Sequence, residues 1–147
     1  MGAYVAIAGI VVFTIAVFLD WISVDNENNR SFSGYETDSL IPFVAFLGIG
    51  FAAALLYALS RAYRRHHRGL TLSCMAAGIA ATLLALAYII DRPGAAERGD
   101  NLSIELGVYV ALIGGLLWAV GSGLLAKEPE GDDVDDRRST TGGTATG

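Results

Sequence analysis

The chain has 147 residues, of which 53% are hydrophobic and only 17% are charged, whereas soluble domains carry roughly 25% charged residues. Its net charge of −5 provides no basic surface for nucleic acid, and its single cysteine excludes an internal disulfide and a cysteine-based metal cage. This composition indicates a small integral membrane protein whose surroundings are the lipid bilayer.

Four long apolar segments follow one another along the chain. They cover about residues 3–24, 40–60, 70–90 and 106–126. Each is long enough to cross a hydrocarbon core of about 30 Å as an α-helix, and none shows the polar face of a soluble amphipathic helix. Because the connections are short, we predict an all-α polytopic protein, an antiparallel four-transmembrane-helix bundle that forms one domain over residues 1–127.

The basic residues of the connections predict how this bundle is oriented. The second connection carries four arginines and no acidic residue: Arg61, Arg64, Arg65 and Arg68. The first connection contains one arginine and the third contains two. The positive-inside rule therefore places the second connection and both termini in the cytoplasm of a cell-membrane protein. We expect the four arginines to contact anionic lipid at the inner membrane surface.

The segment from residue 128 to residue 147 differs in kind from the rest of the chain. It contains six acidic residues and ends in a run of Ser, Thr and Gly. Such a segment buries too little apolar surface to fold, so we predict a disordered acidic tail in the cytoplasm. A solvated extension and a docking tail for a basic partner both stay open.

Small residues repeat every four positions on three of the apolar segments. Rows of this kind let helices approach closely in lipid, where hydrophobic attraction between helices is weak. The predicted helix-packing residues are Gly107, Ala111, Gly115, Ala119 and Gly123 on the fourth segment and Ser73, Ala77, Ala81 and Ala85 on the third, with Gly50, Ala54 and Ala58 on the second. The row around Gly115 could pack within one chain or form a homodimer.

Several polar and aromatic residues gather near the outer ends of the predicted helices. The candidates for an outer mouth or for partner contacts are Asp20, Trp21, Phe32, Tyr35 and Glu105. Aromatic side chains anchor helices at membrane interfaces, and Asp20 could form an ion pair with an outer arginine, namely Arg30, Arg92 or Arg98. The outer connections also contain glycosylation sequons at Asn29 and Asn101, whose modification the sequence leaves open.

No motif in the sequence indicates catalysis. Cys74 is the lone cysteine and is expected to pack as a small apolar residue. His66 and His67 lie among the arginines of the second connection, where neighbouring positive charge disfavours a metal ion or haem iron. We therefore predict no catalytic residue, no metal site and no cofactor, and expect that the protein is not an enzyme.

The layout resembles small, functionally uncharacterised four-helix integral membrane proteins of prokaryotes. The residues that carry the likeness are Trp21 at the end of the first apolar segment, the Ser33-Gly34-Tyr35 sequence of the outer connection, and the basic stretch 61–68. The likeness implies a four-helix membrane fold and no particular activity.

These observations lead to two expectations about function. The first is a structural or accessory subunit that binds another membrane protein or itself through its small-residue helix faces, with added selectivity from the outer connection or the acidic tail. The alternative is a small oligomeric transporter or channel with Asp20 and Glu105 at its outer mouth.

Overall fold

The computed structural model describes residues 1–25, 30–60, 68–91 and 102–128 of the chain. Within them, the helices are α1 (Gly2–Val17), α2 (Gly34–Thr37), α3 (Leu40–Ser60), α4 (Arg68–Ile90) and α6 (Leu106–Lys127), and the strands are β1 (Asp20–Val24), β2 (Arg30–Ser33) and β3 (Leu102–Ile104). The chain is thus mostly helical. Three of the helices, α3, α4 and α6, are long and apolar enough to cross a membrane, and they lie on the predicted apolar segments.

The first apolar segment differs from the prediction of one helix over residues 3–24. α1 ends at Val17, and the chain continues from Asp20 as strand β1. A carboxylate at the C-terminal end of a helix is unfavourable because of the helix dipole, and the β-branched residues Ile22 and Val24 favour a strand. The apolar segment therefore contains a helix followed by a strand, and α1 alone is a shorter apolar helix.

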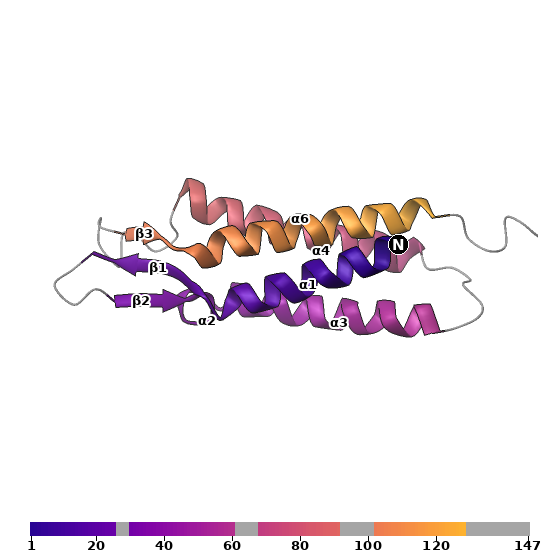
Figure 1. Cartoon of the computed structure of the whole chain (residues 1–147), viewed down its shortest axis with the longest axis horizontal. Coiled ribbons are helices and arrows are strands. Elements are labelled where there is room, and N and C mark those ends of the chain that lie inside the picture. The colour runs from indigo at the N-terminus through magenta and orange to yellow at the C-terminus, as the bar shows by residue number, and fades with distance from the viewer. Residues whose placement is uncertain (26–29, 61–67, 92–101, 129–147) are drawn as a thin grey trace, which may run out of the picture.

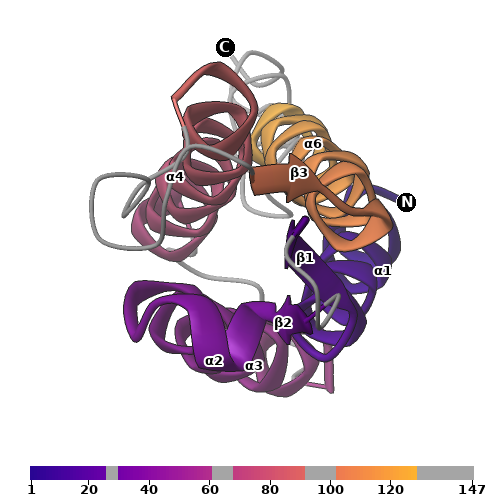
Figure 2. The same ribbon diagram turned by 90° about the vertical axis from the view of Figure 1, so that its left-hand side faces the viewer.

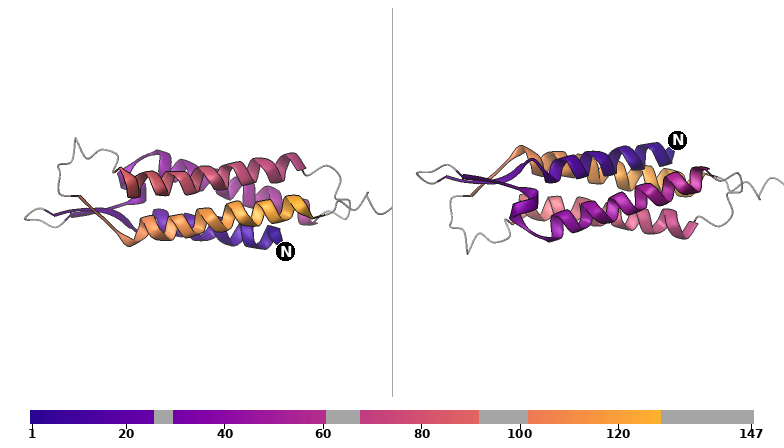
Figure 3. Two further views of the ribbon diagram at one scale, coloured as in Figure 1. Left: turned by 90° about the horizontal axis from the view of Figure 1, so that it is seen from above. Right: turned by 90° about the horizontal axis from the view of Figure 1, so that it is seen from below.

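The four longer helices lie alongside one another, with the sheet at one end and the N-terminus at the other (Figure 1). Viewed along the helices, they follow the order α1, α6, α4 and α3 around the molecule (Figure 2). α6 packs extensively against both α1 and α4, whereas α3 packs less closely against its two neighbours. The views from above and below show the same arrangement, with the strands extending beyond the helix ends (Figure 3). We call the end of the molecule at which the strands lie the sheet end.

The three strands form an antiparallel sheet in the order β2-β1-β3. Ile22 of the central strand faces Phe32 of β2 on one side and Ile104 of β3 on the other. The register of β1 against β2 shifts between Asp20 and Ile22, as in a β-bulge. The sheet therefore joins the chain segment after α1 to the segment that leads into α6.

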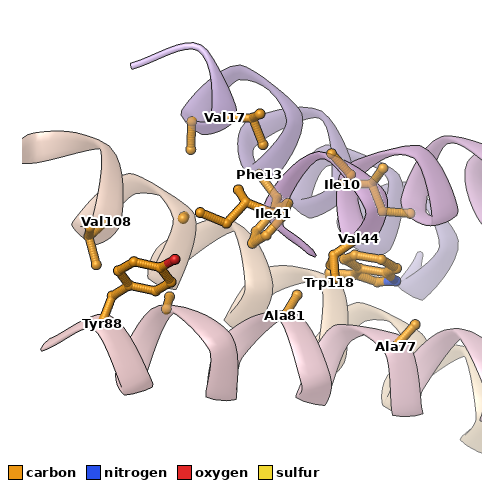
Figure 4. Close-up of a cluster of buried hydrophobic side chains, with 14 of the residues drawn as sticks. Ile10, Phe13, Val17, Ile41, Val44, Ala77, Ala81, Tyr88, Val108 and Trp118 are labelled. Carbon is orange, nitrogen blue, oxygen red and sulfur yellow. The ribbon is translucent and has the colours of Figure 1, made fainter. Parts of the chain in front are cut away.

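Large apolar side chains fill the space between the helices. Phe13 of α1 and Trp118 of α6 are fully buried, and their rings meet edge to face with centroids 6.4 Å apart. Phe51 of α3 contacts the same indole, also at 6.4 Å. Figure 4 shows how side chains from α1, α3, α4 and α6 converge on this core, from Ala77 near one end to Tyr88 near the other.

Candidate functional site

The sheet is attached to the helices through Trp21, whose side chain is fully buried. Its indole N–H donates a hydrogen bond of 2.7 Å to the carbonyl oxygen of Ala16, in the last turn of α1. A Cβ atom on Gly34 or on Gly107 would come within 2.6 Å of the ring. These two glycines therefore make room for the indole, which holds the ends of α1, α2 and α6 around one side chain.

Tyr88 brings the end of α4 to the same place. Its ring meets the indole of Trp21 edge to face, with the centroids 5.3 Å apart and the planes at 90°. The Tyr88 hydroxyl donates to a carboxylate oxygen of Asp38, just before α3, at 3.4 Å. Aromatic pairs in this geometry stabilise a fold by about 0.5–1.5 kcal/mol beyond their buried area. The base of the sheet therefore joins the ends of all four longer helices.

Glu105 links the sheet to the start of α6. Its backbone N–H donates to the carbonyl oxygen of Trp21 at 2.9 Å, and its carboxylate accepts a hydrogen bond of 2.6 Å from the Ser23 hydroxyl. Glu105 is the residue immediately before the first turn of α6, where the helix dipole favours a negative charge. Both contacts join β1 to the chain before α6.

The structure places the five predicted outer residues in different surroundings. Asp20 and Tyr35 are exposed, Phe32 and Glu105 are half-buried, and Trp21 has no exposed surface. Trp21 is therefore not a surface contact in this structure but supports the sheet from inside. The Tyr35 ring instead stacks on exposed Phe18, with centroids 6.5 Å apart and planes 8° from parallel.

The sheet end is strongly acidic. Its described residues include the single cation Arg30 and the carboxylates of Asp20, Asp25, Glu36, Asp38, Asp91 and Glu105. Among the described residues, a salt bridge lies at the other end of the helices, between the N-terminal ammonium of Met1 and Glu128 at 2.9 Å, and none joins Asp20 to Arg30. The other predicted partners of Asp20, Arg92 and Arg98, lie outside the described residues, as do the sequons at Asn29 and Asn101.

The predicted small-residue row of α6 faces two different neighbours. A Cβ atom on Gly115 would lie 2.8 Å from the backbone nitrogen of Thr82, so this glycine faces α4. Ala119 also lies against α4, because a Cβ atom on Gly78 of α4 would lie 2.6 Å from the backbone nitrogen of Ala119. Ala111 is buried. At the C-terminal end of the row the packing is less close, because a Cβ atom on Gly123 would meet only Met75 Sδ, at 3.5 Å. Gly107, as described above, faces Trp21.

A second glycine face of α6, which the sequence analysis did not identify, packs against α1. A Cβ atom on Gly114 would lie 2.6 Å from the backbone nitrogen of Phe13, and one on Gly121 would come still closer to the backbone nitrogen of Ala6. On α1, Gly9 and Gly2 meet the α6 backbone in the same way. The signal in the sequence is a seven-residue spacing on both helices, which a search for four-residue rows misses.

The remaining predicted rows are only partly buried. On α4, Ala77, Ala81 and Ala85 lie in the core, whereas Ser73 is exposed. On α3, Gly50 is exposed, and a Cβ atom on it would meet nothing within 4 Å. Ala54 and Ala58 are half-buried. The α3 row therefore contributes little to packing within this chain.

Cys74 lies in a small buried polar cluster between α4 and α6. The indole N–H of Trp118 lies 3.1 Å from the thiol sulfur, and the Ser122 hydroxyl lies 3.2 Å from it. The same hydroxyl is 2.9 Å from the Trp118 carbonyl oxygen. All three side chains have no exposed surface. The thiol thus acts as a hydrogen-bond acceptor as well as a packing residue.

The opposite end of the helices is the one that carries the basic connection. Arg68 is exposed at the start of α4, whereas Arg61, Arg64, Arg65, His66 and His67 lie outside the described residues. The predicted acidic tail also lies outside them, apart from Glu128. In the part of the chain that the structure describes, no three His, Cys, Asp or Glu side chains come together to hold a metal ion.

Comparison of the chain with protein-family models, with curated proteins and with solved structures found no match. The distinctive element of this chain is a small sheet that projects beyond a set of apolar helices, at the acidic end of the molecule.

Proposed function

We propose that the protein is a non-enzymatic membrane protein that serves as a structural or accessory subunit for another membrane protein. In this proposal α1, α3, α4 and α6 all cross the bilayer as an antiparallel four-helix bundle. α1 has 16 residues and alone spans about 24 Å at 1.5 Å per residue. It lies along α6 over its whole length, and the first residues of β1 complete the crossing.

The backbone after α1 supports this crossing because its polar groups have partners. The carbonyl oxygen of Leu19 accepts from the Gly34 N–H at 3.2 Å, and that of Trp21 accepts from the Glu105 N–H at 2.9 Å. Non-helical backbone near membrane depth is tolerated where the protein itself supplies such hydrogen bonds.

The distribution of charge supports one orientation for the proposed bundle. The connection with four arginines leads into α4 at the end opposite the sheet, and the N-terminus lies at that same end. The positive-inside rule then predicts that both termini lie in the cytoplasm and the acidic sheet end lies outside.

The observation that carries the proposed role is the contrast between the filled interior and the projecting sheet. The interior between the helices is occupied by large side chains, including Phe13, Trp21, Tyr88 and Trp118. The sheet, by contrast, presents exposed polar and charged side chains, namely those of Asp20, Arg30, Ser31 and Ser103. We infer that the protein acts by presenting the sheet to a partner.

The experiment that tests this role is site-specific photo-crosslinking at natural expression level. A photo-reactive residue in place of exposed Ser31 on β2 should yield one discrete crosslinked partner, identified by mass spectrometry. The same residue in place of Ile79, an exposed apolar position on α4, is the matched control and should yield none. Crosslinks only between copies of this chain would contradict the role and favour the alternative, a small oligomeric transporter or channel.

A further inference from the structure

Two exposed aromatic rings lie together where α1 ends. Phe18 follows the last residue of α1, and Tyr35 lies in the short helix α2, which contacts α1 at the sheet end (Figure 1). The two rings are stacked with their planes 8° from parallel, yet Phe18 is 70% exposed and Tyr35 is 55% exposed. Both rings therefore keep a large part of their surface open to a molecule outside the chain.

An exposed apolar face of α1 leads to this aromatic pair. Val11 and Ile15 are about half exposed, and they precede Phe18 by seven and three residues. This spacing places the three side chains on one face of the helix. In the proposed crossing, that face lies in the hydrocarbon and ends at the outer boundary of the bilayer. A molecule that covers the whole face has apolar chains along α1 and a polar group beside Phe18 and Tyr35.

The charge beside the two rings is negative. Asp20 and Glu36 are exposed and lie close to the rings in sequence. Both also lie near Ser33, because Asp20 pairs with Ser33 across the strands and the Glu36 carboxylate accepts a hydrogen bond of 3.3 Å from its hydroxyl. Within the described residues no salt bridge involves either carboxylate, and Arg30 pairs with the opposite end of β1. The two charges thus lack a cation from the described part of the chain.

The rings and the carboxylates both favour a positively charged group. A cation within about 6 Å of a ring centroid is attracted by the negative face of the ring, and the carboxylates attract the same charge. A headgroup that carries only negative charge would instead be repelled. A free cation in water would leave the apolar face of α1 uncovered. The arrangement therefore favours an ammonium group that is attached to acyl chains.

We propose that Phe18, Tyr35, Asp20 and Glu36 bind the ammonium headgroup of an outer-leaflet phospholipid whose acyl chains lie along α1. Tyrosine also suits this depth, because its ring contacts apolar groups while its hydroxyl reaches the polar region. The inference rests on the proposed crossing of the bilayer by α1. It adds a lipid partner to the proposed accessory role and does not depend on the identity of a protein partner.

The test is photo-labelling of the full chain in non-ionic detergent micelles. The probe is a phosphatidylethanolamine with a diazirine near the glycerol end of one acyl chain, which leaves the ammonium group intact. Mass spectrometry should map its crosslinks to residues 15–20 and 34–36. Unlabelled phosphatidylethanolamine should displace the probe about twofold to fivefold better than phosphatidylglycerol with the same acyl chains, the effect of one exposed ion pair. Crosslinks elsewhere only, or equal displacement by both lipids, would overturn the proposal.

Substitution of the rings tests the aromatic part of the site. Phe18→Leu and Tyr35→Leu keep an apolar side chain but remove the ring, and each should lower labelling at the site about twofold to fivefold. Tyr109→Leu, at an exposed position of α6, is the matched control and should leave the labelling unchanged. Since all three positions are exposed, the unfolding temperatures should stay close to that of the parent. Unchanged labelling in the double variant of Phe18 and Tyr35 would overturn the proposal.

Substitution of the carboxylates tests the selection of charge. Asp20→Asn and Glu36→Gln keep the size of each side chain, and Gln at position 36 keeps an acceptor for Ser33. In the double variant, phosphatidylethanolamine and phosphatidylglycerol should displace the probe almost equally. An unchanged preference for phosphatidylethanolamine would show that the carboxylates do not select the headgroup, and it would overturn that part of the proposal.

Failure of this inference can be told apart from failure of the proposed function. Alkaline carbonate extraction of native membranes should leave the chain in the membrane fraction. If it does so but the probe does not label the site, the crossing stands and the headgroup site is wrong. If the chain is extracted as a peripheral protein, the proposed crossing is wrong and the inference fails with it. Crosslinking from Ser31 tests the accessory role separately.

Discussion

Trp21 and Ala16 are joined by a buried hydrogen bond of 2.7 Å between the indole N–H and a backbone carbonyl oxygen. The last carbonyl groups of a helix have no partner within the helix, so the indole replaces part of the helical turn that α1 does not form. The same ring packs between Gly34 and Gly107. Trp21 thus caps the C-terminal end of α1 and also attaches the sheet to the helices.

Replacing Trp21 should therefore loosen both α1 and the sheet. Trp21→Phe keeps an aromatic ring but removes the N–H, which leaves the Ala16 carbonyl oxygen with the Leu19 backbone N–H, at 3.1 Å, as its remaining donor. We expect the loss of this hydrogen bond to lower the free energy of unfolding in detergent micelles by about 0.5–1.5 kcal/mol. Tyr109→Phe, at an exposed position of α6, is the control and should change it little. Equal stability of the two variants would show that the hydrogen bond is unimportant.

Gly9 and Gly50 offer a matched pair of glycine substitutions. A Cβ atom at Gly9 would lie 2.7 Å from the carbonyl oxygen of Gly114, whereas one at Gly50 meets nothing within 4 Å. Gly9→Ala should destabilise the protein by about 1–3 kcal/mol through overpacking. Gly50→Ala should be neutral or stabilising, because alanine is the better helix former by about 1 kcal/mol. Thermal unfolding in one detergent measures both, and a reversed order would place α1 away from α6.

Gly115 and Gly123 test the contact between α4 and α6 on a single helix. Gly115→Ala forces the α4 backbone at Thr82 to move, since the added carbon would lie 2.8 Å from its nitrogen. Gly123→Ala makes an ordinary contact of 3.5 Å with the flexible Met75 side chain. We expect only the first variant to lower the unfolding temperature. If Gly115→Leu also leaves stability and assembly unchanged, Gly115 faces lipid.

Cys74 should be required for its hydrogen bonds rather than for its reactivity. Cys74→Ala leaves the buried Trp118 N–H without an acceptor and should cost about 1–3 kcal/mol of stability. Cys74→Ser restores an acceptor and should recover part of that loss, which denaturant unfolding monitored by tryptophan fluorescence can measure. Alanine and serine variants of equal stability would mean that only the volume of the residue matters.

The proposed orientation can be tested by labelling engineered cysteines in intact cells. Ser31→Cys lies at the sheet end and Lys127→Cys at the opposite end, and both positions are exposed. A membrane-impermeant maleimide should label the first directly and the second only after the cells are permeabilised. The buried native Cys74 provides the unlabelled background. The opposite pattern would reverse the topology.

The sequence by itself determined the helices that depend on local composition. α3, α4 and α6 coincide with long apolar segments because a run of about 20 apolar residues has no stable alternative to a helix in lipid. The separation of basic and acidic connections is also a property of the sequence. Because the length and composition of these segments are enough to favour a helix, the three long helices could be located without knowing what they pack against.

Only the tertiary structure decided where α1 ends and which glycines lie at which interface. The strand after α1 exists because Ile22 pairs with Phe32 and with Ile104, which is distant in the sequence. Small residues occur on several faces of α6, and packing selects Gly114 for α1 and Gly115 for α4. Both outcomes depend on contacts between distant segments, which no periodicity within one segment can reveal.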